Sequence, residues 1–174
     1  MQIAVDAMGG DHAPEAIVTG VIEAVKELKD VGIILVGKKE IILEEIKKHK
    51  GQHASITLEN ASQVIDMDES PAVALRTKKD SSILVCSKLV KEKRAQAIVS
   101  AGNTGAVMGS MLMNAGRLKG ILRPAIASII PNFSGGVTLL LDVGANVDCK
   151  PASLFQFALM GHVYANYIFG INNP

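Results

Sequence analysis

The amino-acid sequence predicts an α/β fold with an open, mostly parallel β-sheet, helices on both faces of the sheet and one antiparallel hairpin. Short apolar runs alternate with longer amphipathic segments along the chain, which is the pattern of repeated βα units. The short runs are apolar at successive positions, as strands buried on both faces are. Many of the 16 glycines follow these runs in short clusters, where a parallel sheet has its βα turns.

The expected strands are short and apolar, and they lie at residues 3–5, 33–36, 55–58, 97–99, 126–130 and 137–141. The last two are joined by the segment Asn-Phe-Ser-Gly-Gly, residues 132–136, which is short enough for a hairpin. The other strands are separated by helical patterns, and such long connections favour parallel pairing.

The expected helices are segments whose apolar residues recur at helical spacing, and they lie at residues 14–29, 38–50, 70–78, 81–94, 104–117 and 151–169. Pro14 occupies a favourable first position in the first of them. We expect these elements to form a single α/β domain over residues 1–174. Because the chain stops after a helix, where such a fold returns to another strand, we interpret it as a fragment of a longer enzyme.

The composition is that of a globular protein, with 48% hydrophobic and 20% charged residues. Only 3% of the residues are aromatic and Trp is absent, which argues against a stacking surface for nucleic acid. The two cysteines form no disulfide framework and no metal-binding C-x-x-C spacing, so we expect no metal and a cytoplasmic location. We expect no signal peptide, and we expect the uncharged residues 95–116 and 151–174 to be buried in protein rather than to span a membrane.

Charge is distributed unevenly although the net charge is only +1. Residues 76–123 contain ten Lys or Arg against Asp80 and Glu92, a local charge of +8. Such a segment favours an anionic ligand or an acidic partner. The alternative is a set of solvated helix faces, which is the more common role of any single surface cation.

Three glycine-bearing loops follow expected strands and precede helices, at residues 6–11, 102–105 and 142–146. Open parallel sheets bind ligands beyond the carboxyl ends of their strands. Glycine lets the backbone approach a ligand, and the start of a helix presents N–H groups to an anion. We therefore expect the three loops to converge on a phosphate-bearing or otherwise anionic small molecule.

Other motifs are weaker. Residues 32–39 resemble a P-loop but lack its final Ser or Thr, and the G-x-G-x-x-G fingerprint of dinucleotide-binding proteins is absent.

His12, beside Asp11, is the one histidine with an expected functional role, since His49, His53 and His162 are expected to be solvated or to lie on a helix face. Cys149 is a candidate nucleophile for an acyl thioester, but a structural role is favoured.

Several distinct motifs occur together in order: Asp6-Ala-Met-Gly-Gly-Asp11, Lys78-Lys-Asp-Ser-Ser82, Ser100-Ala-Gly-Asn-Thr-Gly-Ala106, Arg123-Pro-Ala125, Leu141-Asp-Val-Gly-Ala-Asn146, Gln156-Phe-Ala158 and Met160-Gly161. With these motifs the chain closely resembles the phosphate:acyl-[acyl carrier protein] acyltransferases over essentially its whole length. Several motifs in register are far more specific than any one glycine loop.

The resemblance implies a fold like that of the isocitrate dehydrogenases and phosphotransacetylases, a homodimer, and no metal or organic cofactor. It implies transfer of a fatty acyl group from acyl-[acyl carrier protein] to inorganic phosphate, giving acyl phosphate that a membrane acyltransferase uses to acylate glycerol 3-phosphate. It also implies a cytoplasmic protein with peripheral membrane contact. The family's next motif, Leu-Leu-Asn-Ile-Gly-Glu-Glu leading to Lys-Gly-Asn, is not reached, so we expect the 174-residue polypeptide alone to be inactive.

For this chemistry the candidate catalytic residues are Asn103, Thr104 and Asn146. Phosphate is already a nucleophile near neutral pH, so the enzyme must mainly position it and stabilise the oxyanion. We expect the backbone N–H groups of Gly102, Asn103 and Thr104, with the Thr104 hydroxyl, to form a cradle for phosphate or the oxyanion. Asn146 is expected to donate to the same group, and Gly105 is a further candidate for binding phosphate.

The charged candidates have supporting roles. Arg123 is expected to face phosphate, while Arg117 and Lys119 are expected to meet the acidic carrier protein. The candidates for orienting loops are Asp6, Asp11, His12 and Asp142. A simple cap or turn hydrogen bond is the alternative role for each of these aspartates.

Two other functions remain open. A phosphotransacetylase-like transferase that uses acyl-coenzyme A would need the same nucleophile. A non-catalytic anion-binding or regulatory module would have the same sheet. A dehydrogenase is disfavoured because the dinucleotide fingerprint is missing.

Overall fold

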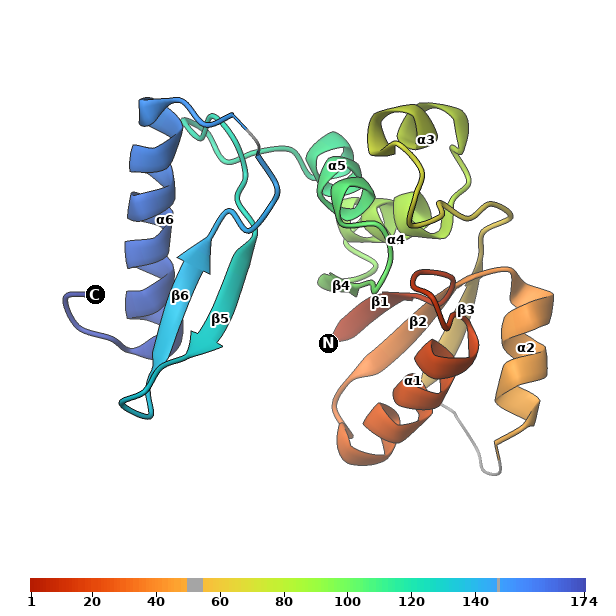
Figure 1. The fold of residues 1–174 in the computed structure, drawn as a ribbon. Helices are drawn as coiled ribbons and strands as arrows, with labels where there is room; N and C mark the ends of the chain where they lie inside the picture. Colours follow the sequence, from red (N-terminus) through yellow and green to blue (C-terminus); the bar gives the residue numbers. More distant parts are fainter. Residues whose placement is uncertain (50–54, 147) are drawn as a thin grey trace. The chain divides into compact units, whose positions relative to one another are not determined.

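The computed structural model describes residues 1–49, 55–146 and 148–174. His53 lies outside these residues. The chain forms two compact units, unit 1 over Met1–Gly116 and unit 2 over Arg117–Pro174. Figure 1 shows the fold of each unit. The expectation of a single domain over residues 1–174 stays a prediction.

Unit 1 contains a four-stranded sheet in the order β3-β2-β1-β4, and every neighbouring pair of strands is parallel. Its strands are β1 (Gln2–Asp6), β2 (Gly32–Gly37), β3 (Ile56–Asn60) and β4 (Ala97–Val99). Its helices are α1 (Glu15–Glu27), α2 (Lys39–Lys47), α3 (Pro71–Thr77), α4 (Ser82–Lys91) and α5 (Thr104–Asn114). The predicted parallel sheet is confirmed.

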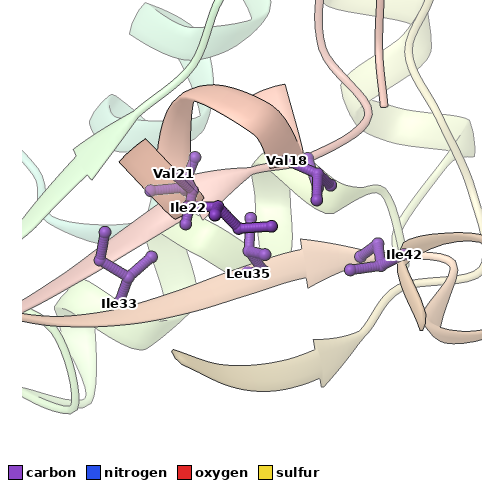
Figure 2. Packing of buried hydrophobic residues seen from close by; sticks show 8 residues of the cluster. Val18, Val21, Ile22, Ile33, Leu35 and Ile42 are labelled. Atoms are coloured by element: carbon purple, nitrogen blue, oxygen red, sulfur yellow. The ribbon is translucent and has the colours of Figure 1, made fainter. Parts of the chain in front are cut away.

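Helices cover both faces of this sheet. On one face, α1 and α2 pack on alternate residues of β1 and β2, and Figure 2 shows Val18, Val21 and Ile22 of α1 above Ile33 and Leu35. On the other face, α4 packs on the residues in between, as shown by the second core cluster of Ala4, Ile34, Val36, Cys86 and Leu89. Consecutive apolar residues in β2 therefore serve two cores, which is why the strand lacks alternation.

Helices α4 and α5 each end three residues earlier than predicted, as α2 also does. Helix α4 stops at Lys91, and Lys93 adopts a left-handed backbone conformation with φ of 60°. Helix α5 stops at Asn114, shortly before Gly116, whose φ is +77°. A left-handed residue just past the last turn is a common way to end a helix, and the sequence pattern missed it because the neighbouring residues are still helix formers.

Unit 2 contains the predicted antiparallel hairpin, formed by β5 (Ala127–Pro131) and β6 (Val137–Leu141), and one long helix, α6 (Pro151–Phe169). Helix α6 packs on β6, and Gly161 permits close approach because a Cβ there would lie 2.9 Å from Leu141 Cδ1. Within the described residues, no helix is both long and apolar enough to cross a membrane.

Candidate functional site

The strand order of unit 1 defines where a ligand fits best. The chain leaves β1 through α1 to β2 on one side, whereas β4 pairs with β1 on the other side. The connections that follow β1 and β4 therefore diverge, and this topological switch point is where open α/β sheets bind ligands. The loops at this point are residues 7–14 and 100–103, which overlap two of the three predicted glycine loops, 6–11 and 102–105.

A buried carboxylate joins the two loops. Asp6 is only 2% exposed, and its Oδ1 accepts the N–H of Met8 at 3.1 Å. Its Oδ2 accepts the Ser100 hydroxyl at 2.8 Å, and the Ser100 Oγ in turn accepts the N–H of Gly102 at 3.0 Å. Asp6 thus orders its own loop and, through Ser100, the loop after β4. This geometry supports the loop-orienting role that we expect for Asp6.

The two loops also touch through their main chains. A Cβ at Gly9 would lie 2.8 Å from the nitrogen of Gly102, and a Cβ at Gly102 would lie 3.1 Å from the Cα of Gly9. Gly10 has a φ of +104°, which side chains rarely permit. Glycine is therefore required here for backbone contact as well as for the turn. The convergence of loops 6–11 and 102–105 is present in the structure.

Asn103 is a structural clamp at the start of α5. Its Oδ1 accepts the N–H of Ala106 at 3.0 Å, which makes it the N-cap of the helix. Its Nδ2 donates to the carbonyl oxygens of Glu69 at 3.0 Å and Met67 at 3.2 Å, with that of Asp66 at 3.4 Å. The side chain is 7% exposed. Its polar atoms are thus committed to protein partners, which leaves the backbone N–H for the expected anion-binding role.

One of the N–H groups predicted to bind an anion is not available for this role in the structure. The N–H of Gly102 is occupied by Ser100, so it does not face a ligand. The hydrogen bonds of the described residues give the N–H groups of Thr104 and Gly105 no acceptor. Thr104 is exposed and Gly105 is half-buried. The first turn of α5 therefore has two N–H groups without an acceptor among the described residues, and Thr104 itself is exposed.

A pocket of about 350 Å³ adjoins this region. Its walls are the β1–α1 loop and the segment that joins β3 to α3. The lining residues are Met8, Gly10, Asp11, Ile65, Asp66, Met67 and Asp68. The acidic side chains Asp11, Asp66 and Asp68 give the pocket a negative potential. His12 does not line this pocket; it is exposed and lies in a separate groove along α1 with Glu15 and Thr19.

One cation counters this negative charge. Lys78 Nζ donates to the Glu69 carboxylate and, at 2.6 Å, to the carbonyl oxygen of Val64, and it lies 3.8 Å from Asp66 Oδ2. Glu69 Oε1 also accepts the N–H of Asp66 at 3.0 Å. That hydrogen bond, followed by the one from Lys78, lowers the pKa of Glu69. Lys78 lies in one of the sequence motifs, but its contacts join residues without helical or strand spacing, so no local pattern assigns it a role.

Unit 2 contains the third loop and a hydrogen-bonded cluster of its own. Asn146 Nδ2 donates to Asp142 Oδ1 at 2.8 Å and to the carbonyl oxygen of Pro124 at 3.1 Å, and its Oδ1 accepts from Arg123 at 3.4 Å. Asp142 has a left-handed φ of 64°. Asn146 therefore links the β6–α6 loop to Arg123. The approach of this loop to the loops of unit 1 stays a prediction.

Cys149 is placed as a hydrogen-bond donor in this cluster. Its thiol donates to Asp142 Oδ2 at 3.3 Å. Burial, followed by this hydrogen bond and the charge of Asp142, raises the pKa of Cys149. A thiol with a raised pKa is a poor nucleophile at neutral pH, which agrees with the structural role favoured by the sequence.

The remaining charged candidates lie in the segment before β5. Arg117 and Lys119 are exposed, and the Arg117 guanidinium donates to the carbonyl oxygen of Leu122. Among the described residues, no group of three or more His, Cys, Asp or Glu side chains is arranged to hold a metal ion.

Solved structures share this fold. A phosphotransacetylase from Streptococcus pyogenes is 18% identical, with a TM-score of 0.71 over 98% of this chain and 55% of its own. A branched-chain phosphotransacylase from Enterococcus faecalis V583 is 13% identical, with a TM-score of 0.59 over 95% of this chain and 51% of its own. The chain thus has the α/β fold of the phosphotransacylases, as the sequence predicted.

The sequence comparisons identify the family. The model of the family described as "Fatty acid synthesis protein" matches residues 1–174, and the chain belongs to this family. A relative from Heliobacterium modesticaldum is 56% identical and one from Syntrophomonas wolfei is 52% identical, and both are named "Phosphate acyltransferase". The alignments cover the whole chain but only 52% and 54% of these relatives, so the chain spans about half their length.

Proposed function

We propose that this chain supplies the phosphate-binding half of an acyltransferase that moves a fatty acyl group from acyl-[acyl carrier protein] to inorganic phosphate. The product is acyl phosphate for phospholipid synthesis. The observation that carries the proposal is identity of 52% and 56%, over the whole chain, to proteins named phosphate acyltransferase. The switch-point crevice, with the exposed first turn of α5 beside it, supports the same chemistry.

The reaction requires little covalent chemistry from the protein. A phosphate oxygen attacks the thioester carbonyl carbon, which forms a new C–O bond and a tetrahedral oxyanion. The oxyanion then collapses to a carbonyl group and the C–S bond breaks. The carrier thiolate leaves and takes up a proton from phosphate or solvent. The protein must hold phosphate against the carbonyl and stabilise the oxyanion, which preorganised N–H groups do well.

In this proposal the N–H groups of Thr104 and Gly105 donate hydrogen bonds to phosphate or to the oxyanion. The Thr104 hydroxyl is a third donor. Asn103 contributes its backbone N–H, while its side chain holds the start of α5 in place. In unit 2, Arg123, whose guanidinium donates to Asn146 Oδ1, is proposed as a further residue that offers positive charge to phosphate. Asp6 and Asp142 order the loops rather than react.

The proposal extends to partners and location. Arg117 and Lys119 are exposed cations suited to the acidic carrier protein. The enzyme acts as a cytoplasmic homodimer in peripheral contact with the membrane, needs no cofactor, and passes acyl phosphate to a membrane acyltransferase that uses glycerol 3-phosphate.

The test is an activity assay of a polypeptide that contains this chain and has the full length of the curated relatives. Acyl-[acyl carrier protein] or acyl-coenzyme A is offered with phosphate, and acyl phosphate is trapped with hydroxylamine. Turnover with the carrier thioester, lost in Thr104→Val, is expected. Turnover only with coenzyme A would support the phosphotransacetylase-like alternative, and phosphate binding without turnover of either thioester would support the anion-binding module.

A further inference from the structure

The crevice of unit 1 poses an electrostatic problem for a phosphate ligand. Asp11, Asp66 and Asp68 line the pocket beside it, and Glu69 follows directly on the same segment. A phosphate dianion entering here meets several carboxylates at close range. Two helical N–H groups alone offer only partial positive charge against this field. A full positive charge near the start of α5 would offset it.

Lys78 supplies a positive charge beside these carboxylates. Its ammonium contacts the Glu69 carboxylate and lies 3.8 Å from Asp66 Oδ2, so one cation faces two acidic residues. The side chains of Lys78 and Glu69 are 28% and 27% exposed, so water screens the pair only in part.

The same segment lies directly against the start of α5. Asn103 Nδ2 binds the Glu69 carbonyl oxygen at 3.0 Å while Asn103 Oδ1 caps the helix. Helix α3 confirms the proximity, because a Cβ at Gly105 would lie 2.6 Å from Pro71 Cγ. The segment that carries Glu69 therefore packs against the first turn of α5 through the Glu69 main chain and Pro71.

We infer that Lys78 is a positioning residue that acts through Glu69 and Asp66: it neutralises these carboxylates so that the start of α5 accepts a phosphate dianion. This inference rests on the proposed function and names the residue that sets the affinity of the site for phosphate. Lys78 does not contact the phosphate. It sets the potential at the site through its acidic partners.

Breaking the ion pair from its two sides separates this role from a structural one. Lys78→Met leaves Glu69 and Asp66 uncompensated, so phosphate binding is expected to weaken about three- to tenfold. Glu69→Gln breaks the same contact but removes a negative charge, so phosphate binding is expected to stay equal or to tighten. A purely structural role would make the two variants change in the same direction.

The measurement is a titration of the ¹⁵N-labelled 174-residue chain with inorganic phosphate, followed at the amide signals of Thr104 and Gly105. Lys79→Met is the matched control, since among the described residues Lys79 Nζ donates a hydrogen bond only to the carbonyl oxygen of Leu75, in the preceding helix α3. Its phosphate affinity is expected to stay within about twofold of that of the unaltered chain. Lys78→Arg keeps the charge and is expected to restore binding if Lys78→Met folds poorly.

The outcomes separate the two proposals. Phosphate binding that weakens equally in Lys78→Met and Glu69→Gln would overturn the inference about Lys78 and leave the phosphate site intact. Absence of any phosphate-dependent shift at Thr104 and Gly105 in the unaltered chain would overturn the phosphate site itself. The loss in Lys78→Met is also expected to shrink as KCl is raised, because salt screens charges that do not touch.

Discussion

Unit 1 and unit 2 contain strands that are similarly apolar but differ in how far they are buried. In β2, Ile33 through Gly37 are all buried, because helices cover both faces of the sheet. In β6, none of the residues Val137–Leu141 is buried, although this strand is just as apolar. Helix α6 likewise exposes large apolar side chains, among them Phe155 and Tyr167. An apolar run therefore predicts a strand, whereas the burial of that strand depends on which elements pack against it.

The largest expected effect comes from the core of unit 1. Leu35 is fully buried, so Leu35→Ala is expected to lower the free energy of unfolding by about 2–5 kcal/mol. Leu140 in β6 is 47% exposed, so Leu140→Ala is expected to cost less than about 1 kcal/mol. Urea denaturation followed by circular dichroism measures both. Equal losses in the two variants would contradict the difference in burial.

The next effect concerns the two asparagine clamps. Asn103→Ala removes the cap of α5 and the contacts to the Glu69 and Met67 carbonyl oxygens, and it is expected to cost about 1–3 kcal/mol. Asn146→Ala removes hydrogen bonds in a more exposed cluster and is expected to cost about 0.5–1.5 kcal/mol. The same denaturation experiment compares them. A larger loss for Asn146 would show that unit 2 depends more on its loop than unit 1 does.

A smaller effect is expected from acid. Hydrogen bonds from the Ser62 hydroxyl and then its backbone N–H lower the pKa of Asp80, and the Asp66 N–H and then Lys78 lower the pKa of Glu69. A lowered folded-state pKa contributes stability above the unfolded-state pKa, and this stability is lost as pH falls through the folded-state value. Melting temperature is therefore expected to fall as pH drops below about 4.5, and less steeply in Asp80→Asn. An unchanged slope in that variant would rule out the contribution of Asp80.

The smallest effect is expected at Cys149. Its pKa is raised and its thiol donates to Asp142, so Cys149→Ser keeps a donor at the same place. Acyl phosphate formation by the protein at the length of its relatives is expected to change less than about threefold. A loss of several orders of magnitude would instead indicate a covalent acyl intermediate on this cysteine.

Much of the fold was predictable because its signals are local. Apolar runs such as Ile33–Val36 predicted the strands to within a residue or two, and the short connection at 132–136 predicted the hairpin. Helix ends were less predictable, because the left-handed conformation of Lys93 has no strong sequence signal.

The site was predictable only in part. The glycine loops at 6–11 and 102–105 indicated a ligand edge, but the strand order that places the switch point between β1 and β4 depends on long-range pairing. Ser100 was missed because a serine at a strand end is typical of an ordinary turn. Its bond to Asp6 joins residues 94 positions apart, and no local pattern reports such a contact.

The contact between Gly9 and Gly102 has a mechanical consequence. Two main chains that meet without intervening side chains cannot slide or part without losing that packing, so this side of the crevice behaves as one stiff wall. Any change in the width of the adjoining pocket must then come from its other wall, residues 65–68. That wall is held by side-chain contacts from Asn103 and Lys78 rather than by direct packing of one main chain on another.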